Sequence, residues 1–303
     1  MPIRITLAKD PSQTDAVLKL RHKVFGEEEG VFDAIPDGRV LDRFDAFSTT
    51  SNLVALNEGE VVGSMRMTLD SSMGIPADEY YDFRRFMPED AIVMNCGMYC
   101  VTKPFRGARI ALGLILMAAY YAVTHKVTHV VAPINPAIAK LLGRVGFKAL
   151  DDEQIDPHMG IPFIPVLLDM NHLNDFFYTF AENNRLYNFI ESYECIFYNN
   201  DEYVVRAGEM GDSAFVIIEG EIEVRAAGTD QVLATMGRGE VFGELALLTD
   251  DIRTADVVAR SDLRIMSLPK EAFLEHLMKN PDHAMWMLKS IGKRMKNMLV
   301  KPV

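Results

Sequence analysis

Cysteine is scarce in this sequence, and long apolar runs are absent. The three cysteines, Cys96, Cys100 and Cys195, show no metal-site spacing, and so small and odd a number indicates a reducing compartment. The seven histidines form no HExxH or similar ligand set, so we expect no metal site. No stretch of about 18 apolar residues occurs, and the N-terminal residues lack a charged-then-apolar signal pattern. We therefore expect a cytoplasmic protein without a membrane span.

Positive charge is also in short supply. The chain has 31 Lys and Arg against 43 Asp and Glu, a formal net charge of −12, which disfavours nonspecific binding to nucleic acid. Its 303 residues are enough for two domains, each with its own core. An apolar content of 49% and a charged content of 24% are typical of globular proteins.

The first 172 residues follow the order of a mixed α/β domain: a helix, a hairpin, and then a β-α-β-α-β series. Thr14 is the expected N-cap of the first helix, which should extend to Phe25. The other expected elements are strands at residues 3–7, 53–56, 61–67, 92–101, 127–132 and 163–170, a buried helix at 110–124 and a helix at 136–145.

Residues 173–200 are rich in aromatics and asparagine and contain no clean strand pattern. We expect a helical connector there, with helices at residues 173–180 and 186–193. Residues 201–303 contain short strands separated by glycine turns, then helices at 270–279 and 282–300. The expected division is thus an α/β domain at 1–172, a connector at 173–200 and an all-β domain with flanking helices at 201–303.

The second domain is organised around GEVFGELALLTDDIRTADV at residues 239–257. Gly243 lets the backbone approach a phosphate closely, and the N–H groups of a helix that opens at Glu244 would point toward it. Arg253 can return across the turn to the same phosphate, with the Thr254 hydroxyl beside it. Glu244 is then available to accept from a sugar hydroxyl. The stretch predicts a small, cyclic, negatively charged ligand.

This stretch resembles the phosphate-binding cassette of cyclic nucleotide-binding domains, and the resemblance continues through the strand at residues 214–218. It implies a jelly-roll fold and a cyclic nucleotide, with cyclic AMP favoured over cyclic GMP. The implied ligand-lining residues are Gly243, Glu244, Leu245, Arg253, Thr254 and Ala255. An alternative is a barrel that has lost its ligand and keeps Glu244 and Arg253 as a surface ion pair. Related regulators continue into a helix-turn-helix, for which Val303 leaves no room, so we expect no DNA binding.

A second anion site is expected in the first domain, between a strand and the buried helix. The segment from Val101 to Ala111 can present successive backbone N–H groups to a diphosphate. It resembles the acyl-coenzyme A loop of the GNAT superfamily, although Arg109 replaces the middle glycine and Leu142 stands where many members have a tyrosine. The implied donor-binding residues are Val101, Arg106, Gly107, Ala108, Arg109, Ile110, Ala111 and Asn135. The alternative is an ordinary strand-helix turn with solvated arginines.

Four charged residues of the N-terminal third suggest where the acceptor is activated. Arg21, the pair Asp42 and Asp45, and Arg66 resemble the pattern of acyl-homoserine lactone synthases and long-chain N-acyl amino acid synthases. Val40 stands where the lactone synthases have an acidic residue, so we do not expect lactone formation. The aspartates can hold and deprotonate an amine, and the arginines can bind an acceptor carboxylate or orient the aspartates. The alternative is a salt-bridge network that ties helix to sheet.

Together these features predict an N-acyltransferase that moves an acyl group from acyl-coenzyme A or an acyl carrier protein to an amine, such as an amino acid, under control of a cyclic nucleotide. A homodimer is compatible with the sequence. Two alternatives are a non-catalytic signalling protein and a protein lysine acetyltransferase under cyclic AMP control. The donor should meet a basic edge made by Lys103, Arg106, Arg109, Lys140, Arg144 and Lys148.

Overall fold

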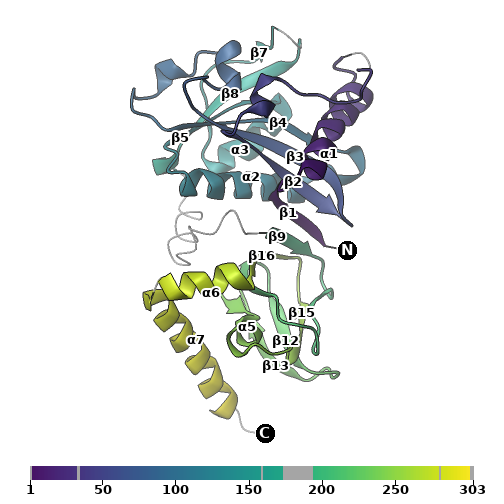
Figure 1. The fold of residues 1–303 in the computed structure, drawn as a ribbon, viewed down its shortest axis with the longest axis vertical. Helices are drawn as coiled ribbons and strands as arrows, with labels where there is room; N and C mark the ends of the chain where they lie inside the picture. Colours follow the sequence, from purple (N-terminus) through teal and green to yellow (C-terminus); the bar gives the residue numbers. More distant parts are fainter. Residues whose placement is uncertain (1, 33–34, 158–159, 173–193, 280, 301–303) are drawn as a thin grey trace. The chain divides into compact units, whose positions relative to one another are not determined.

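A computed structural model describes residues 2–32, 35–157, 160–172, 194–279 and 281–300 (Figure 1). The chain divides into two compact units: residues 3–179 form the first, and residues 180–303 with residues 1–2 form the second. The helices expected at 173–180 and 186–193 lie outside the described residues. Within the described ranges, every helix is too short or too polar to cross a bilayer.

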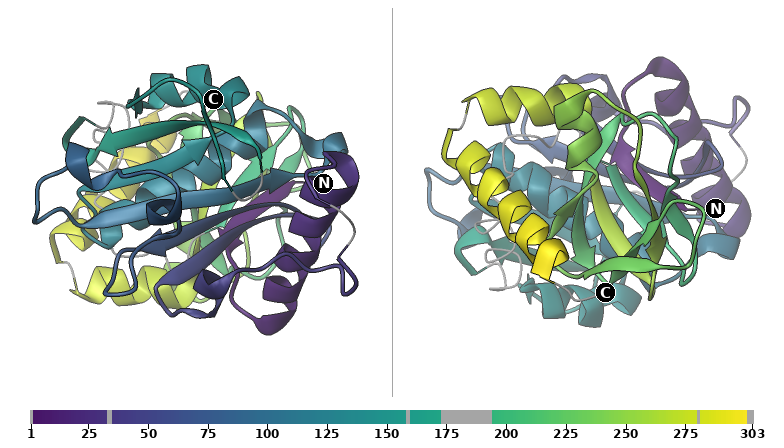
Figure 2. Two further views of the ribbon diagram at one scale, coloured as in Figure 1. Left: turned by 90° about the horizontal axis from the view of Figure 1, so that it is seen from above. Right: turned by 90° about the horizontal axis from the view of Figure 1, so that it is seen from below.

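The first unit is built on one mixed sheet with the strand order β1-β2-β3-β4-β5-β8-β6, and β7 pairs with β8. Only the β4–β5 pair among these is parallel. Figure 2 gives a view of these strands from above, in its left panel. The elements are β1 (Ile3–Leu7), α1 (Pro11–Arg21), β2 (Thr50–Asn57), β3 (Glu60–Leu69), β4 (Val93–Val101), α2 (Ala108–Thr124), β5 (His129–Ile134), α3 (Ala139–Val145), β6 (Lys148–Ala149), β7 (Gln154–Ile155) and β8 (Pro162–Asp169).

The first helix differs from its expected form at both ends. Asp10, not Thr14, is the N-cap, and its carboxylate accepts from the backbone N–H of Gln13 at 2.9 Å. Proline at the first helical position then favours an earlier start than the apolar spacing indicates. The α-helix ends at Arg21, and the chain continues as a π-helix over His22–Glu28. A π-turn holds one residue more than an α-turn and recurs at functional sites.

The two faces of the sheet are covered by different helices. Adjacent residues of β2 point to opposite faces. Asn52 accepts from Arg21 at the end of α1, and Ser51 meets the hydroxyl of Tyr121 on α2 at 3.1 Å. The α1 face therefore carries Asn52 and, opposite it in the register, Arg66, and the α2 face is packed against an almost wholly apolar helix.

Strands β4 and β5 separate at a defined point. Their parallel pairing stops at Asn95 and Val131, although β4 continues to Val101. The buried Asn95 amide donates to the Val131 carbonyl of β5 at 3.1 Å and to the Cys96 carbonyl of β4 at 3.2 Å. It therefore supplies a hydrogen bond to one backbone carbonyl of each strand where the strands part. Next to this fork, the register of β3 on β4 slips, and Met98 has a positive φ of 47°. A bulge bends its strand, which accounts for the separation.

The second unit is a β-sandwich. One antiparallel sheet has the order β14-β11-β16-β9, and the other is four-stranded with the order β10-β15-β12-β13. Apolar side chains from both sheets share one core, with Ile196, Ile217, Ile222 and Val257 among its members. The strands are β9 (Glu194–Tyr198), β10 (Tyr203–Val205), β11 (Ser213–Glu219), β12 (Ile222–Ala226), β13 (Val232–Met236), β14 (Val241–Phe242), β15 (Ala255–Ala259) and β16 (Leu263–Pro269).

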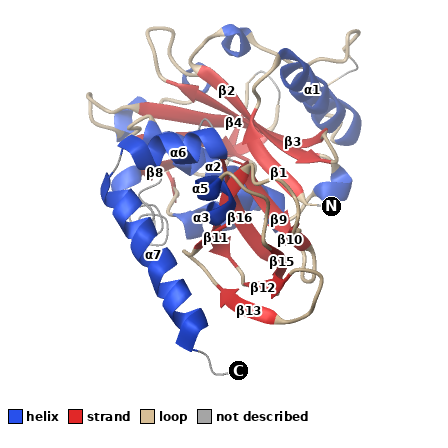
Figure 3. Ribbon diagram, turned by 60° about the horizontal axis from the view of Figure 1, so that its bottom comes forward, coloured by secondary structure: helices blue, strands red, loops and turns tan. Residues whose placement is uncertain are grey.

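Three helices complete this unit: α5 (Glu244–Thr249), α6 (Lys270–Lys279) and α7 (Pro281–Val300). Figure 3 shows them along one side of its strands, and α7 is the long yellow helix in the right panel of Figure 2. Strand β9 lies inside the range expected to be a helical connector, so that expectation is wrong for Glu194–Tyr198. Because residues 195–198 are all buried, the strand lacks the alternation that would have revealed it.

Two glycines of this β-sandwich allow the cost of steric overlap to be measured separately from the cost of backbone strain. Gly220 has a φ of +92°, and a Cβ there would lie 2.4 Å from the Asp262 carbonyl oxygen. Gly228 has a φ of +67° with open space around it. We expect Gly228→Ala to cost about 1–2 kcal/mol of unfolding free energy from the left-handed conformation alone. Gly220→Ala should cost more than about 3 kcal/mol because overlap adds to strain.

Urea unfolding followed by tryptophan fluorescence measures this difference, because the one tryptophan of the sequence, Trp286, belongs to α7 of the same unit. Equal losses for the two variants would contradict the tight approach at Gly220.

Candidate functional site

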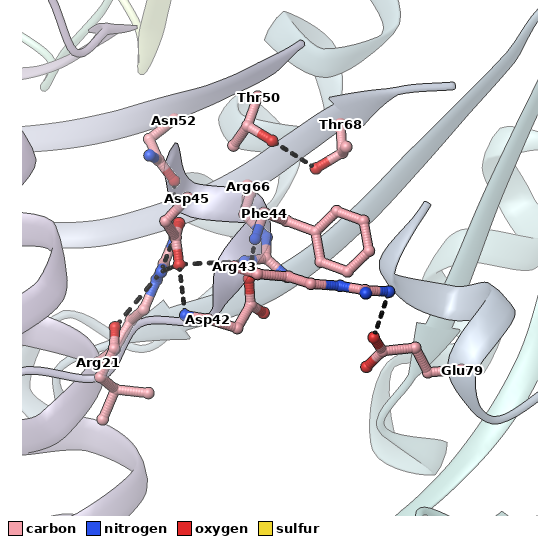
Figure 4. A network of polar contacts seen from close by, with 11 residues as sticks. Arg21, Asp42, Arg43, Phe44, Asp45, Thr50, Asn52, Arg66, Thr68 and Glu79 are labelled. Atoms are coloured by element: carbon pink, nitrogen blue, oxygen red, sulfur yellow. Dashed lines mark hydrogen bonds and ion pairs between the residues drawn. The ribbon is translucent and has the colours of Figure 1, made fainter. Parts of the chain in front are cut away.

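The four charged residues singled out in the N-terminal third meet on the α1 face of the sheet (Figure 4). Arg21 has no exposed surface, and its Nη1 donates to both carboxylate oxygens of Asp45 at 2.9 Å. Arg66, 3% exposed, donates to Asp42 at 2.8 Å and to Asp45 at 3.1 Å. Buried charges are tolerated only when paired in this way, so the network is an obligatory part of the fold.

The two aspartates have different roles within this network. Asp45 is 7% exposed at its side chain, and besides both arginines it accepts from the Asp42 backbone N–H at 3.1 Å. Asp42 caps the short helix Arg43–Ala46, and its Oδ1 accepts from the Phe44 N–H and from Arg66, each at 2.8 Å. Its side chain is 35% exposed, and no described residue donates to its Oδ2. Asp42 therefore presents an open carboxylate oxygen, which Asp45 does not.

Asn52 is a member of this network that the sequence analysis did not identify. Its side-chain oxygen accepts from Nη2 of Arg21 at 2.7 Å. In the β2–β3 register Asn52 lies opposite Arg66. A β-bulge between Ala55 and Leu56 shifts that register by one residue, so counting back from the turn at residues 57–60 would have placed Asn52 beside Met65 instead.

The expected donor loop joins the end of β4 to the start of α2. Arg106 donates through Nε to the Val101 carbonyl at 2.9 Å, and its Nη2 lies 2.8 Å from Glu28 and 3.0 Å from Glu29. Arg106 is thus ion-paired rather than simply solvated. Glu28, the last residue of the π-helix, was not singled out from the sequence because 78 residues separate it from Arg106.

The other residues of this loop divide by orientation. Gly107 is the N-cap of α2, with extended backbone, so the N–H groups of the first turn follow it directly. Ile110 and Ala111 are 2% and 7% exposed, so they can meet a ligand only through their backbone. Asn135 lies at the end of β5, where its side chain caps a 3-10 turn by accepting from the Ala137 N–H at 2.9 Å. The side chain of Ala108 lies outside the described residues, and Arg109 is partly exposed.

In the second unit, the arrangement around α5 suits a phosphodiester. Gly243 has a φ of +75°, and a Cβ there would lie 2.9 Å from Nη1 of Arg253 and 3.1 Å from the Phe215 ring. The 5% exposed Arg253 donates to the carbonyls of Gly243 and Ser213, each at 2.6 Å. Burial lowers the pKa of Arg253, though an arginine remains charged. This cradle fits a phosphate group, whose oxygens are better acceptors for the guanidinium than neutral carbonyls.

The partner of Glu244 is not Arg253, as the surface ion-pair alternative required, but Arg294 of α7. Glu244 is 1% exposed, so the surface ion pair of that alternative is wrong on burial as well as on pairing. Burial raises the pKa of Glu244, and the Arg294 charge opposes this rise. Arg294 also donates to the Val241 carbonyl at 2.8 Å. The closing helix is therefore fastened to the residue expected to bind the sugar.

The remaining expected residues lie around this cradle. Leu245 is 49% exposed on α5, Thr254 is exposed, and Ala255 begins β15. Together with Gly243, Glu244 and Arg253 they surround the start of α5.

Comparison with known proteins assigns both units. A family model described as N-acyl amino acid synthase FeeM matches residues 16–169, just over half of the chain. A model described as cyclic nucleotide-binding domain matches residues 195–280. The solved structure of FeeM, an N-acyl amino acid synthase from uncultured soil microbes, is 16% identical, covers 56% of this chain and 93% of that one, and has a TM-score of 0.48.

The curated relatives match a shorter part of the chain. The Homo sapiens cGMP-dependent protein kinase 2 is 33% identical over 95 residues, which cover 30% of this chain and 12% of the kinase. The cAMP-dependent protein kinase regulatory subunit of Yarrowia lipolytica is 39% identical over 84 residues, 25% of this chain and 22% of that subunit. The chain thus spans less than a quarter of the length of these relatives.

The family match favours an enzyme over the non-catalytic alternative. The chain belongs to the FeeM family of N-acyl amino acid synthases, and its polypeptide also carries a cyclic nucleotide-binding domain.

Proposed function

We propose that the first unit, with a GNAT-like fold, transfers an acyl group from a phosphopantetheine thioester to the amino group of an amino acid or related small amine, and that a cyclic nucleotide bound to the second unit sets the rate. The thioester would be acyl-coenzyme A or an acylated carrier protein. The observation that carries the catalytic half is the open Oδ2 of Asp42, on a carboxylate held in place by Arg66.

The position of Asp42 relative to the fork supports this assignment. Arg66 pairs in register with Gly97, two residues beyond the last β4 residue that pairs with β5. The Asp42 carboxylate, bonded to Arg66, therefore lies close to where β4 loses its parallel partner. Backbone N–H groups of β4 beyond the fork are suited to donate to the oxygen of a thioester carbonyl and to stabilise its developing charge.

The transfer then needs few participants. An acceptor that arrives as an ammonium ion first loses one proton to solvent. The neutral amine then attacks the thioester carbon, the C–N bond forms, and the C–S bond breaks to release the thiolate. Asp42 accepts the proton that the nitrogen loses, and solvent protonates the sulfur. General-base assistance of this kind contributes roughly 10²- to 10⁴-fold in rate. Arg66 orients the Asp42 carboxylate, and Asp45, which accepts from both arginines, holds Arg66 in place.

Direct attack by the amine is favoured over an acyl-cysteine intermediate. Burial raises the pKa of Cys96, Cys100 and Cys195 to about 12, so these side chains remain thiols near neutral pH. A nucleophilic cysteine requires the thiolate.

An acidic cavity is linked to Asp42 through the neighbouring residue Arg43. Arg43, next to Asp42, extends to Glu79 at 2.8 Å, as Figure 4 shows, and Glu79 is one of the lining residues of an open cavity of about 570 Å³. The lining residues are Asp78, Glu79, Tyr80, Tyr81, Asp82, Arg84 and Pro157. Since carboxylates outnumber the one arginine, this cavity favours approach of an acceptor in its ammonium form.

Regulation follows from the partners of the nucleotide-site residues. A cyclic nucleotide phosphate would take Arg253 from two carbonyls, and its ribose would compete with Arg294 for Glu244. We favour cyclic AMP. A ligand changes activity only through unequal affinity for two states of the chain. Arg294 belongs to α7, so loss of its ion pair with Glu244 would free this helix from the nucleotide site.

The division of labour between the aspartates predicts a contrast between two variants. Asp42→Asn should lower kcat about 100-fold or more because the base is lost. Its unfolding free energy should change by less than about 1 kcal/mol because a partly exposed pair contributes little. Asp45→Asn should destabilise by about 3–5 kcal/mol because it leaves Arg21 buried and unpaired.

Mass spectrometry of products from decanoyl-coenzyme A or decanoyl carrier protein with an amino-acid mixture measures the first effect, and urea unfolding the second. Full activity in folded Asp42→Asn would contradict its role as base.

The raised pKa of Glu244 predicts that nucleotide binding depends on pH. The sugar hydroxyl needs the carboxylate form, so lowering the pH through the raised pKa protonates Glu244 and weakens binding. Below that pKa, the affinity should fall by up to about tenfold per pH unit. Glu244→Gln should bind more weakly with little pH dependence between about pH 7.5 and about pH 5.

Calorimetric titration with cyclic AMP and with cyclic GMP measures both proteins. The same pH slope in parent and variant would assign the titration to another group.

The experiment that tests regulation compares thioester consumption with and without saturating cyclic AMP or cyclic GMP. We expect a change of about 5- to 150-fold, the usual range of allosteric coupling. Arg253→Gln should retain the nucleotide-free rate and lose the response, because the guanidinium that binds the phosphate is gone. Equal rates in all conditions would refute control by the nucleotide while leaving acyl transfer intact.

A further inference from the structure

Glu28 places its carboxylate where a phosphate of the acyl donor is expected. Its Oε2 accepts from Nη2 of Arg106 at 2.8 Å and from the backbone N–H of Lys103 at 3.1 Å. One guanidinium and one loop N–H are the partners that a phosphate oxygen seeks at such a turn. The chain therefore supplies an anion of its own to this site.

The Glu28 contact is held from both sides. Arg106 is oriented by its second bond, from Nε to the Val101 carbonyl, so Nη2 points toward the carboxylates. The Glu28 side chain is only 13% exposed, whereas Glu29, which also reaches Arg106 at 3.0 Å, is 38% exposed. Glu28 is thus the built-in contact, and Glu29 is a peripheral one.

The two carboxylates at Arg106 oppose binding of a negatively charged donor. Two carboxylates face the single guanidinium of Arg106, so an arriving phosphate meets like charge unless Glu28 moves. The Arg106 side chain is 39% exposed, so a donor can reach it once Glu28 has left.

We propose that Glu28 is an internal competitor for the phosphate of the acyl donor: it occupies Arg106 and the Lys103 N–H, and productive donor binding displaces it. This inference rests on the proposed acyl transfer and concerns the affinity-setting residue of its donor site. The chemistry named is a phosphate on phosphopantetheine, whether carried by coenzyme A or by a carrier protein.

The local backbone provides a route for the displacement. Glu28 is the last residue of the π-helix His22–Glu28, in which the Glu29 N–H bonds the Val24 carbonyl at 3.0 Å. A π-turn contains one residue more than an α-turn, so a local return to α geometry turns Glu28 about the helix axis and away from Arg106. Arg21, which caps the other end, keeps its partners in the acceptor network. Donor affinity should therefore change without a change in acceptor affinity.

The test uses the full-length protein and calorimetric titration with two probes, coenzyme A and a carrier protein bearing phosphopantetheine. Glu28→Gln keeps an oxygen for the Lys103 N–H but removes the charge. We expect it to bind at least one probe about tenfold more tightly, to lower the donor KM by a similar factor and to leave the acceptor KM unchanged. The two probes identify which carrier supplies the phosphate.

Glu27→Gln is the matched control. It makes the same change of charge in the same π-helix, but Glu27 faces His22 at 3.5 Å and is 64% exposed. Its probe affinity should stay within about twofold of the parent, since exposed charges are screened. A second control combines Glu28→Gln with Arg106→Gln, in which the gain should vanish because the competition acts through Arg106.

Three results would overturn the inference. Unchanged affinity in Glu28→Gln, or equal gains in Glu28→Gln and Glu27→Gln, would refute competition while acyl transfer stands. Failure of both probes to bind parent and variant would refute the donor site itself. If melting shows that Glu28→Gln is unfolded, Glu28→Asp tests the same contact. Its carboxylate is one methylene shorter, so a weaker hold on Arg106 should again raise probe affinity, and no gain refutes the inference.

Discussion

Arg21 is a cation with no exposed surface, and the proposed acceptor site of the first unit depends on how its charge is neutralised. Asp45 supplies the bidentate partner, and Asn52 takes the second nitrogen. Arg66 is shared between Asp45 and one carboxylate oxygen of Asp42. A buried ion pair is weak evidence for stability, but here it fixes the position of the partly exposed Asp42 carboxylate near the β4–β5 fork.

Each site is occupied, at least in part, by groups of the chain itself. Arg106 is paired with Glu28, Arg253 donates to two carbonyls, and Glu244 is paired with Arg294. Such contacts keep charged groups satisfied when they are buried, and they also make ligand binding an exchange of partners. An exchange can be coupled to movement, since the displaced group belongs to a π-helix in one unit and to α7 in the other.

The sequence predicted most elements because their patterns are local. The β2–β3 hairpin, β4, α2 and the helix that opens at Glu244 lie close to where their periodicity placed them. The errors at the start of α1 and at β9 also have physical causes. An early cap at Asp10 lies outside the apolar period of α1, and β9 is buried on both faces and so does not alternate. The four-residue acceptor network was predicted as a set, but not the difference between its aspartates.

The different environments of Asp42 and Asp45 depend on contacts that the sequence does not reveal. Residue types and short spacings determined the anion cradle, because Gly243 and Arg253 lie ten residues apart and a single turn brings them together. The tertiary structure alone decided that Glu244 pairs with Arg294, 50 residues away, and that Glu28 fills the donor loop 78 residues away. A charged side chain pairs with whichever partner the fold brings within about 3 Å, and no local pattern records that choice.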